Sequence, residues 1–320
     1  MFSFFLGYFL LFVIVAILVS FAQFLGGVYV AEPEYPFAIL RTTPSLFNGS
    51  SVYLFVSIGL AICISLYIYQ LRQNKLFVAL AFLLFICILL TFSRKSILVS
   101  ALVLFSFFVF LGAKNLSGIR YFCFSIFILI SASIVAAFLF YSGLLDRYTL
   151  LFSTYFSLDG DVPARTLLYL HSLMLAEREF PLGTGPGSFA SAYAATNYSN
   201  IYTELGYESV MGLQPMELGG PNYLMDTFWP HVIAEYGFLG GGVYLALWLY
   251  PCYRVIKNRN KIPARLIFLV LSCYFVIFIE SLGGSYPSQL YFVIMYSFVS
   301  VAAFRSLDAK SFSCIKHVSM

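Results

Sequence analysis

The 320 residues are 61% hydrophobic and only 10% charged, with a mean hydropathy of +0.90. About a quarter of the residues in soluble domains are charged, so this composition excludes an ordinary soluble domain and indicates a chain solvated by lipid. The formal net charge of +4 comes without a basic run interleaved with aromatic residues, so we expect no nucleic acid partner.

Eight segments are predicted to be transmembrane helices, because about 20 apolar residues cross a hydrocarbon core of about 30 Å. They lie near residues 3–24, 52–71, 76–92, 97–113, 121–142, 232–253, 266–283 and 286–304. No Lys or Arg precedes the first segment, and its apolar run is too long for a secretory signal, so we interpret it as a retained helix. The sequence therefore predicts an all-α polytopic membrane protein with helices 1–5 in residues 1–142, one large outer loop in residues 143–231, and helices 6–8 with a cytoplasmic tail in residues 232–320.

The basic residues predict the orientation of the chain, since short cytoplasmic loops retain Lys and Arg. With the amino terminus inside, the cytoplasmic segments hold 12 of the 18 basic residues, namely Arg72, Lys75, Lys114, Arg120, Arg254, Lys257, Arg259, Lys261, Arg265, Arg305, Lys310 and Lys316. The outer segments hold the other six, which are Arg41, Arg94, Lys95, Arg147, Arg165 and Arg178. Both termini are therefore predicted to be cytoplasmic and the large loop to be periplasmic or extracellular.

The outer loop is predicted to contain one short amphipathic helix. Residues 165–179 carry apolar side chains at helical spacing, and Asp161 with Pro163 suits the start of such a helix. The helix must end near Phe180, because Pro181 restricts the residue before it. The structural turn that follows is built around Gly183, Gly185 and Gly187. The remainder of the loop, to about Asp226, is predicted to be irregular.

Charged residues at a membrane edge are rare and usually mark a pathway or a site. Glu235 lies about one turn into the sixth predicted span, and Glu280 lies near the outer end of the seventh. Together with three outer arginines, Arg41, Arg94 and Arg165, they are expected to line one outward-facing cavity. Each also has a structural alternative. An arginine, like Lys95, can be solvated at a helix end or on a surface, and a glutamate can pair with a neighbouring arginine as a structural lock.

Three stretches carry a family resemblance. Residues 90–96, LTFSRKS, are similar to a Thr-x-Ser-Arg turn that opens a helix, and Arg165 with its helix and residues 180–189, FPLGTGPGSF, resembles an Arg, helix, Pro-x-Gly-x-Gly pattern. Residues 226–229, DTFW, precede residues 235–240, EYGFLG, at the entrance to a span. In this order and on this side of the membrane, they resemble the O-antigen polymerase and O-antigen ligase (Wzy-type) family. The segment around Arg41 is a further match, and the family usually carries several more spans before it, so the chain resembles a short member or a truncated reading frame.

The resemblance implies a membrane glycosyltransferase that needs no cofactor and no metal. Its donor and acceptor would be oligosaccharide repeat units on a polyprenyl diphosphate such as undecaprenyl diphosphate, polymerised at the outer face of the inner or cytoplasmic membrane, with a flippase and a chain-length regulator as partners. Planar arginine forks neutralise diphosphate well, and the implied clamp is Arg94, Arg165 and Arg41. The acceptor hydroxyl must lose a proton, and the candidate bases, which the sequence does not rank, are Asp226, Glu235 and His231.

One departure from the family pattern bears on the reaction. Ligases of the family carry a His-Asn pair about nine residues before the position of Glu235, where this chain has Asp226 and Thr227, and His231 is about five residues too late. An aspartate here is familiar among the polymerases, so the departure favours a polymerase. The alternatives are a ligase that transfers a finished glycan to a lipid A core or a protein, and a membrane transporter whose charged residues line a permeation path. A transporter should show inverted repeats, or spans broken by Gly or Pro in matching halves, and we find neither in the sequence.

Overall fold

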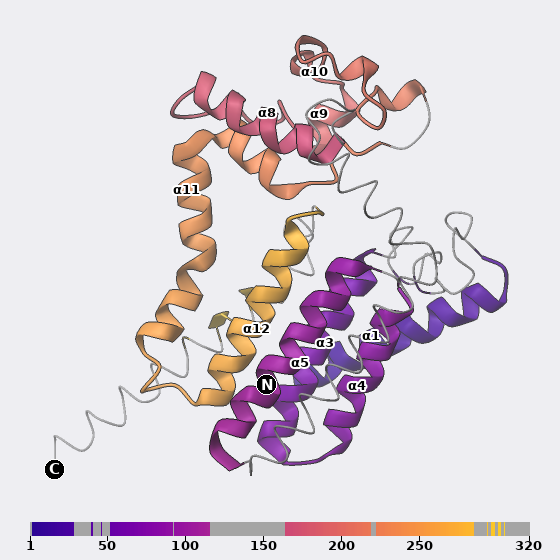
Figure 1. The fold of residues 1–320 in the computed structure, drawn as a ribbon, viewed down its shortest axis with the longest axis vertical. Coiled ribbons are helices and arrows are strands. Elements are labelled where there is room, and N and C mark those ends of the chain that lie inside the picture. The colour runs from indigo at the N-terminus through magenta and orange to yellow at the C-terminus, as the bar shows by residue number, and fades with distance from the viewer. Residues whose placement is uncertain are drawn as a thin grey trace. The chain divides into compact units, whose positions relative to one another are not determined.

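The computed structural model describes residues 2–28, 52–91, 93–115, 164–218 and 222–284, together with the single positions 40, 46, 293, 296, 297, 300, 301 and 304. Every regular element in these residues is a helix, which confirms the predicted all-α fold (Figure 1). The chain divides into two compact units. Residues 1–107 with 241–320 form unit 1, and residues 108–240 form unit 2.

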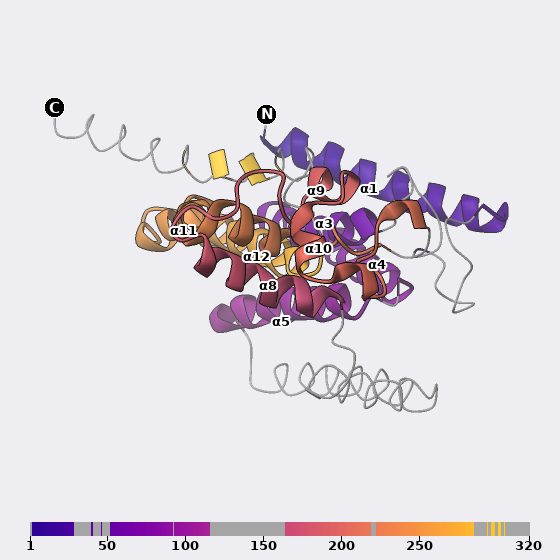
Figure 2. The same ribbon diagram turned by 90° about the horizontal axis from the view of Figure 1, so that it is seen from above.

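Unit 1 contains the apolar helices α1 (Phe2–Leu25), α3 (Val52–Arg72), α4 (Leu76–Leu89), α12 (Ala264–Ser281) and most of α5 (Arg94–Asn115). It also contains residues 241–257 of a further helix, α11 (Phe228–Lys257), which begins in unit 2. The central helix is α3, which packs against α1, α4 and α12 (Figure 1). Figure 2 shows α1 and α5 on opposite sides of it. Every residue of α3 in the range 54–68 is buried, as expected for a helix that is apolar all round. Gly59 allows α12 to come close, since a Cβ there would lie 3.1 Å from Val276.

Four of the described helices are long and apolar enough to cross a membrane: Phe4–Leu25, Tyr53–Arg72, Phe228–Lys257 and Ala264–Ser281. Two further apolar helices, Leu76–Leu89 and Lys95–Val109, are shorter. The predicted spans at 121–142 and, for most of its length, at 286–304 lie outside the described residues. The structure thus confirms a polytopic helical membrane protein, while the number of eight spans stays a prediction.

Unit 2 holds the segment that was predicted as the outer loop. Its elements are α8 (Ala164–Arg178), α9 (Ala192–Thr196), α10 (Asn200–Glu204) and the two 3-10 helices η1 (Tyr207–Ser209) and η2 (Met216–Leu218). The helix α8 confirms the helix predicted at 165–179, with Leu168 and Leu175 buried on one face. The prediction of an irregular segment from the glycine turn to Asp226 is wrong, because Ser191 and Ser199 cap two short helices there with their side chains.

Aromatic side chains form the core of unit 2. Phe189, Tyr202 and Tyr207 are fully buried, and the rings of Tyr202 and Tyr207 stack with their centroids 5.5 Å apart. The hydroxyls of both tyrosines form hydrogen bonds. The Tyr202 hydroxyl accepts one from the Ala190 backbone N–H at 2.8 Å, and the Tyr207 hydroxyl lies 2.9 Å from Nδ1 of His171. Burial raises the pKa of both phenols and lowers the pKa of His171. This buried packing gives the short helices a fixed arrangement that local sequence does not reveal.

Candidate functional site

The helix α11 (Phe228–Lys257) changes direction at Gly237, whose φ of 64° and ψ of −173° are not helical. This positive φ suits glycine, which has no Cβ to clash. The predicted span at 232–253 falls within α11, but the kink was not predicted. A kink interrupts the helical hydrogen bonds around it and leaves backbone carbonyls in need of other donors.

The glycine turn after α8 supplies those donors. The backbone N–H groups of Thr184 and Gly185 donate to the carbonyls of Ala234 and Glu235 at 2.9 and 3.0 Å. In the opposite direction, the Leu239 N–H donates to the Pro181 carbonyl at 3.2 Å. The two backbones are so close that a Cβ on Gly183 would overlap the Ala234 carbonyl oxygen. The predicted structural turn is therefore docked into the kink of α11.

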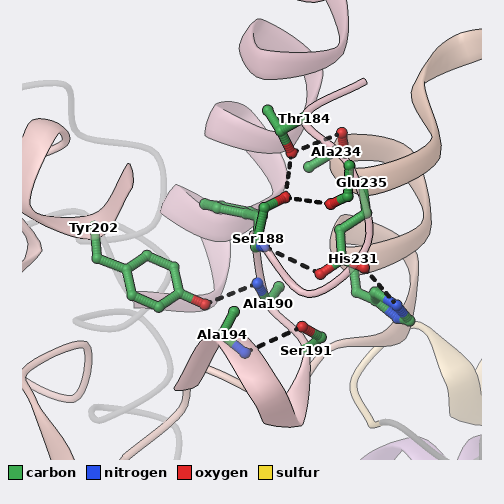
Figure 3. Close-up of polar contacts among 11 residues, drawn as sticks. Thr184, Ser188, Ala190, Ser191, Ala194, Tyr202, His231, Ala234 and Glu235 are labelled. Atoms are coloured by element: carbon green, nitrogen blue, oxygen red, sulfur yellow. Dashed lines mark hydrogen bonds and ion pairs between the residues drawn. The ribbon is translucent and has the colours of Figure 1, made fainter. Parts of the chain in front are cut away.

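The carboxylate of Glu235 fastens this turn from inside. The residue is only 2% exposed, and its Oε1 accepts a hydrogen bond from the Phe189 backbone N–H at 3.1 Å (Figure 3). Its Oε2 lies 3.3 Å from Nε2 of His231, one helical turn earlier. The Ser191 hydroxyl and the Gly187 backbone N–H also interact with this carboxylate. A buried carboxylate requires such partners, and this set joins the turn to α11.

The side chains of the turn add further hydrogen bonds. The hydroxyls of Thr184 and Ser188 lie 2.5 Å apart, and Ser188 donates to the Gly185 carbonyl at 2.6 Å (Figure 3). Ala190, two positions after Ser188, has a left-handed φ of 53°. This conformation costs about 1–2 kcal/mol in a residue with a Cβ. Its hydrogen bond to Tyr202 holds it in that conformation, so the turn is fixed at both ends.

His231 stands between this buried network and the surface. Its side chain is 23% exposed, and its ring meets those of Phe228 and Tyr236 edge to face, with centroids 6.0 Å apart in each case. If Nε2 carries the proton that Glu235 accepts, the lone pair is on Nδ1. Within the described part of the chain, Nδ1 has no hydrogen-bond partner. The arrangement is that of a histidine oriented by a carboxylate.

Arg165 and Asp226 form a second, more exposed pair in unit 2. A guanidinium nitrogen of Arg165 lies 2.5 Å from Oδ2 of Asp226, and the two side chains are 50% and 37% exposed. The Tyr223 ring lies on the guanidinium, with its centroid 5.4 Å from Cζ. Arg165 comes from the first turn of α8, and Asp226 comes from the segment before α11. The pair presents both signs of charge at the surface of unit 2.

Lys95 and Glu280 of unit 1 form an ion pair, which is the structural alternative for these two residues. Nζ of Lys95 lies 2.9 Å from Oε2 of Glu280 and also donates to the Glu280 backbone carbonyl at 2.9 Å. The Ser96 hydroxyl donates to Oε1 of Glu280 at 2.6 Å. Glu280 is thus a lock between α12 and the start of α5, with a lysine in place of the expected arginine. Arg94 is the first residue of α5, and Arg41 lies outside the described residues.

The structure therefore brings the candidate residues together in pairs: Arg165 with Asp226 and His231 with Glu235 in unit 2, and Lys95 with Glu280 in unit 1. The single cavity lined by residues of both units stays a prediction. The contact of Tyr223 with Arg165 was not predicted from the sequence. The position of an aromatic residue three places before Asp226, in what the structure shows to be a tight turn, could have indicated it. Among the described residues, no three His, Cys, Asp or Glu side chains converge as metal ligands.

A family model described as O-antigen ligase matches residues 79–245, which is more than half of the chain. A search of curated proteins found no match. The matched range contains both pairs of unit 2, the glycine turn and the start of α5. It also covers the three stretches that carry the family resemblance in the sequence.

Proposed function

Because the chain belongs to the O-antigen ligase family, we propose that it is a membrane glycosyltransferase that polymerises oligosaccharide repeat units carried on a polyprenyl diphosphate. Membership of this family does not favour a transporter. The repeat units would be those of an O-antigen, a capsule or an exopolysaccharide, and the reaction would take place at the outer face of a bacterial inner or cytoplasmic membrane. A flippase that delivers the units and a chain-length regulator are the proposed partners.

The exposed ion pair of Arg165 and Asp226 carries the proposal. In a lipid-linked donor, the anomeric carbon is joined to the diphosphate through a single oxygen. The group that neutralises the diphosphate and the base that activates the acceptor must therefore lie within a few ångströms of the same carbon. An arginine and a carboxylate that meet at 2.5 Å on an accessible surface are close enough to act on the same donor, which supports the proposal.

Donor binding exchanges one anion for another at Arg165. The planar guanidinium binds phosphate oxygens in the same forked geometry as it binds a carboxylate. A diphosphate that takes this position displaces Asp226 and leaves its carboxylate available as a general base. The pair in the structure is then the resting state of the site, in which Asp226 occupies the place of the substrate's charge.

The reaction that follows forms one bond and breaks one bond at the anomeric carbon. The acceptor hydroxyl oxygen forms a bond to the donor's anomeric carbon, and the bond from that carbon to the diphosphate oxygen breaks. The polyprenyl diphosphate leaves with the electron pair, stabilised by Arg165, and the hydroxyl proton passes to Asp226. Arg94 and Arg41 are proposed as further ligands of the diphosphate.

Glu235 and His231 have different proposed roles. Glu235 is a positioning residue, because its carboxylate is buried and bonded to the turn and to His231. His231 is partly exposed and oriented, so it is proposed to hydrogen-bond the acceptor sugar through Nδ1. It is also the alternative base if Asp226 only holds Arg165.

Three features bear on the choice between polymerase and ligase. The aspartate at the position where ligases of the family carry histidine favours the polymerase. The ligase remains the second candidate, because the family model is described by that activity and because His231 lies five residues later on α11.

A reconstituted reaction tests the proposal. The purified full-length chain in liposomes would be given polyprenyl-diphosphate-linked repeat units, with and without a lipid A core acceptor. We expect lipid-linked oligomers in both samples. Transfer to the lipid A core without any lipid-linked oligomer would assign the ligase activity, and no transfer in either sample would contradict both enzymes.

A further inference from the structure

The helix α8 is apolar on two faces. Ala164, Leu168 and Leu175 are buried in the core of unit 2. On the opposite side, Leu170, Leu173 and Met174 are 54%, 47% and 42% exposed. Three large apolar side chains on the outer face of one helix are unusual for a surface bathed in water, where exposed patches of this kind mark interaction sites.

The turn after α8 also exposes large apolar side chains. Phe180 and Leu182, which flank Pro181, are 71% and 66% exposed. The Pro181 carbonyl accepts the hydrogen bond of Leu239 on α11, and that side chain is 57% exposed. We call these six residues the apolar rim: Leu170, Leu173, Met174, Phe180, Leu182 and Leu239.

We propose that the apolar rim lies in the bilayer interface, with lipid acyl chains as its occupant. The hydrogen bond from Leu239 to Pro181 fixes the turn at the level of Leu239, which belongs to a helix long and apolar enough to span the membrane. A water-soluble partner would not reach side chains at that depth, whereas the boundary of the hydrocarbon core would cover them. Helices that lie in the membrane plane bury an apolar face in this way.

The charged residues near the apolar rim are also consistent with a position at the bilayer interface. Glu177 lies one helical turn after Leu173 on the same face of α8 and is exposed. Arg178 is exposed as well, and its Nε lies 2.9 Å from Oε1 of Glu179. Charged side chains such as these are readily solvated among lipid headgroups. Arg165 precedes Leu170 by five residues, or about 7.5 Å along the helix, so α8 would hold this arginine close to the headgroup layer. The inference rests on the membrane class of the chain and stands without the proposed reaction.

Spin labels in the full-length protein test this placement. Single cysteines would replace Leu173 and Leu182 in a variant without native cysteines, reconstituted in phosphatidylglycerol and phosphatidylethanolamine liposomes. Ser209→Cys on η1 is the matched control, because that residue is polar and exposed. We expect collisions with oxygen, which concentrates in lipid, to exceed those with a water-soluble nickel complex at residues 173 and 182, and the reverse at residue 209.

Two results would overturn the proposal. Collisions dominated by the nickel complex at residues 173 and 182 would show that the rim faces water. Poor access of both reagents would show that protein covers it, either another part of this chain or a second copy. All labelled positions are exposed, so the label does not enter a core, and Leu170→Cys provides a second variant on the same face of α8.

Discussion

Nη2 of Arg165 lies 2.5 Å from Oδ2 of Asp226, although the two residues are 61 positions apart in the chain. Between them, the chain forms the glycine turn and the aromatic core of unit 2, which bring the first turn of α8 to the segment before α11. The Tyr223 ring on the guanidinium limits where Arg165 can point. The fold of unit 2 thus presents an arginine and a carboxylate together at the surface.

Loss of Arg165 should remove much of the activity. We expect Arg165→Ala to lower kcat/KM by about 10- to 100-fold, because a charge-assisted hydrogen bond is worth about 1.5–3 kcal/mol and about 1.4 kcal/mol corresponds to a factor of ten. Arg178→Ala is the control, since Arg178 is similarly exposed and also paired, on the same helix. Equal losses in both variants, measured with lipid-linked repeat units in liposomes, would contradict a specific role for Arg165.

Replacement of Asp226 should affect kcat and leave donor binding intact. We expect Asp226→Asn to lower kcat by about 100-fold or more, the contribution typical of a general base, without raising KM for the donor. KM should not rise because Arg165 no longer has to release a carboxylate before it binds the diphosphate. Glu208→Gln is the control for loss of an exposed acid in unit 2. A raised KM with unchanged kcat would mean that Asp226 positions the donor and is not the base.

Hydropathy and helical spacing were enough to predict α3, α8 and the helical membrane class, because these depend on patterns within one segment. The same methods missed the kink of α11 and the short helices of unit 2. Gly237 has a positive φ where the Pro181 turn docks against it. Tyr202 belongs to a buried cluster that also holds Leu168 and Leu224, from other parts of the chain. Such features depend on contacts between segments. The pairing of Glu235 with the Phe189 N–H could not be predicted for the same reason.

The docking of the turn should make Gly183 far less tolerant of substitution than Gly185. Both have positive φ, so alanine strains either backbone by about 1–2 kcal/mol. At Gly183 the added Cβ also overlaps the Ala234 carbonyl, whereas at Gly185 it meets nothing within 4 Å. We expect Gly183→Ala to lose about 1–3 kcal/mol more in the free energy of unfolding. Melting curves in detergent measure this, and equal destabilisation by the two variants would show that the docking is absent.

His171 should make unit 2 sensitive to acid. Burial lowers its pKa, so the unfolded chain takes up a proton at this residue at a higher pH than the folded chain does. Above about pH 6.5 the residue is neutral in both states and has no effect, whereas below that pH stability should fall until the folded form is also protonated. His171→Gln keeps a polar partner for Tyr207 without a titratable group. Melting midpoints between pH 5 and 8 should fall less steeply for this variant, and parallel curves would rule out the effect.

The lengths of glycan on the cell surface test the central claim of polymerisation most directly. A strain that lacks the protein would be compared, on a gel that resolves glycan lengths, with the same strain carrying the intact chain or the Asp226→Asn variant. We predict that the deletion strain and the variant cap their acceptor with a single repeat unit, because a separate ligase remains active, and that the intact chain restores the ladder of longer glycans. A wholly uncapped acceptor with accumulated lipid-linked polymer would contradict the polymerase and assign the ligase activity.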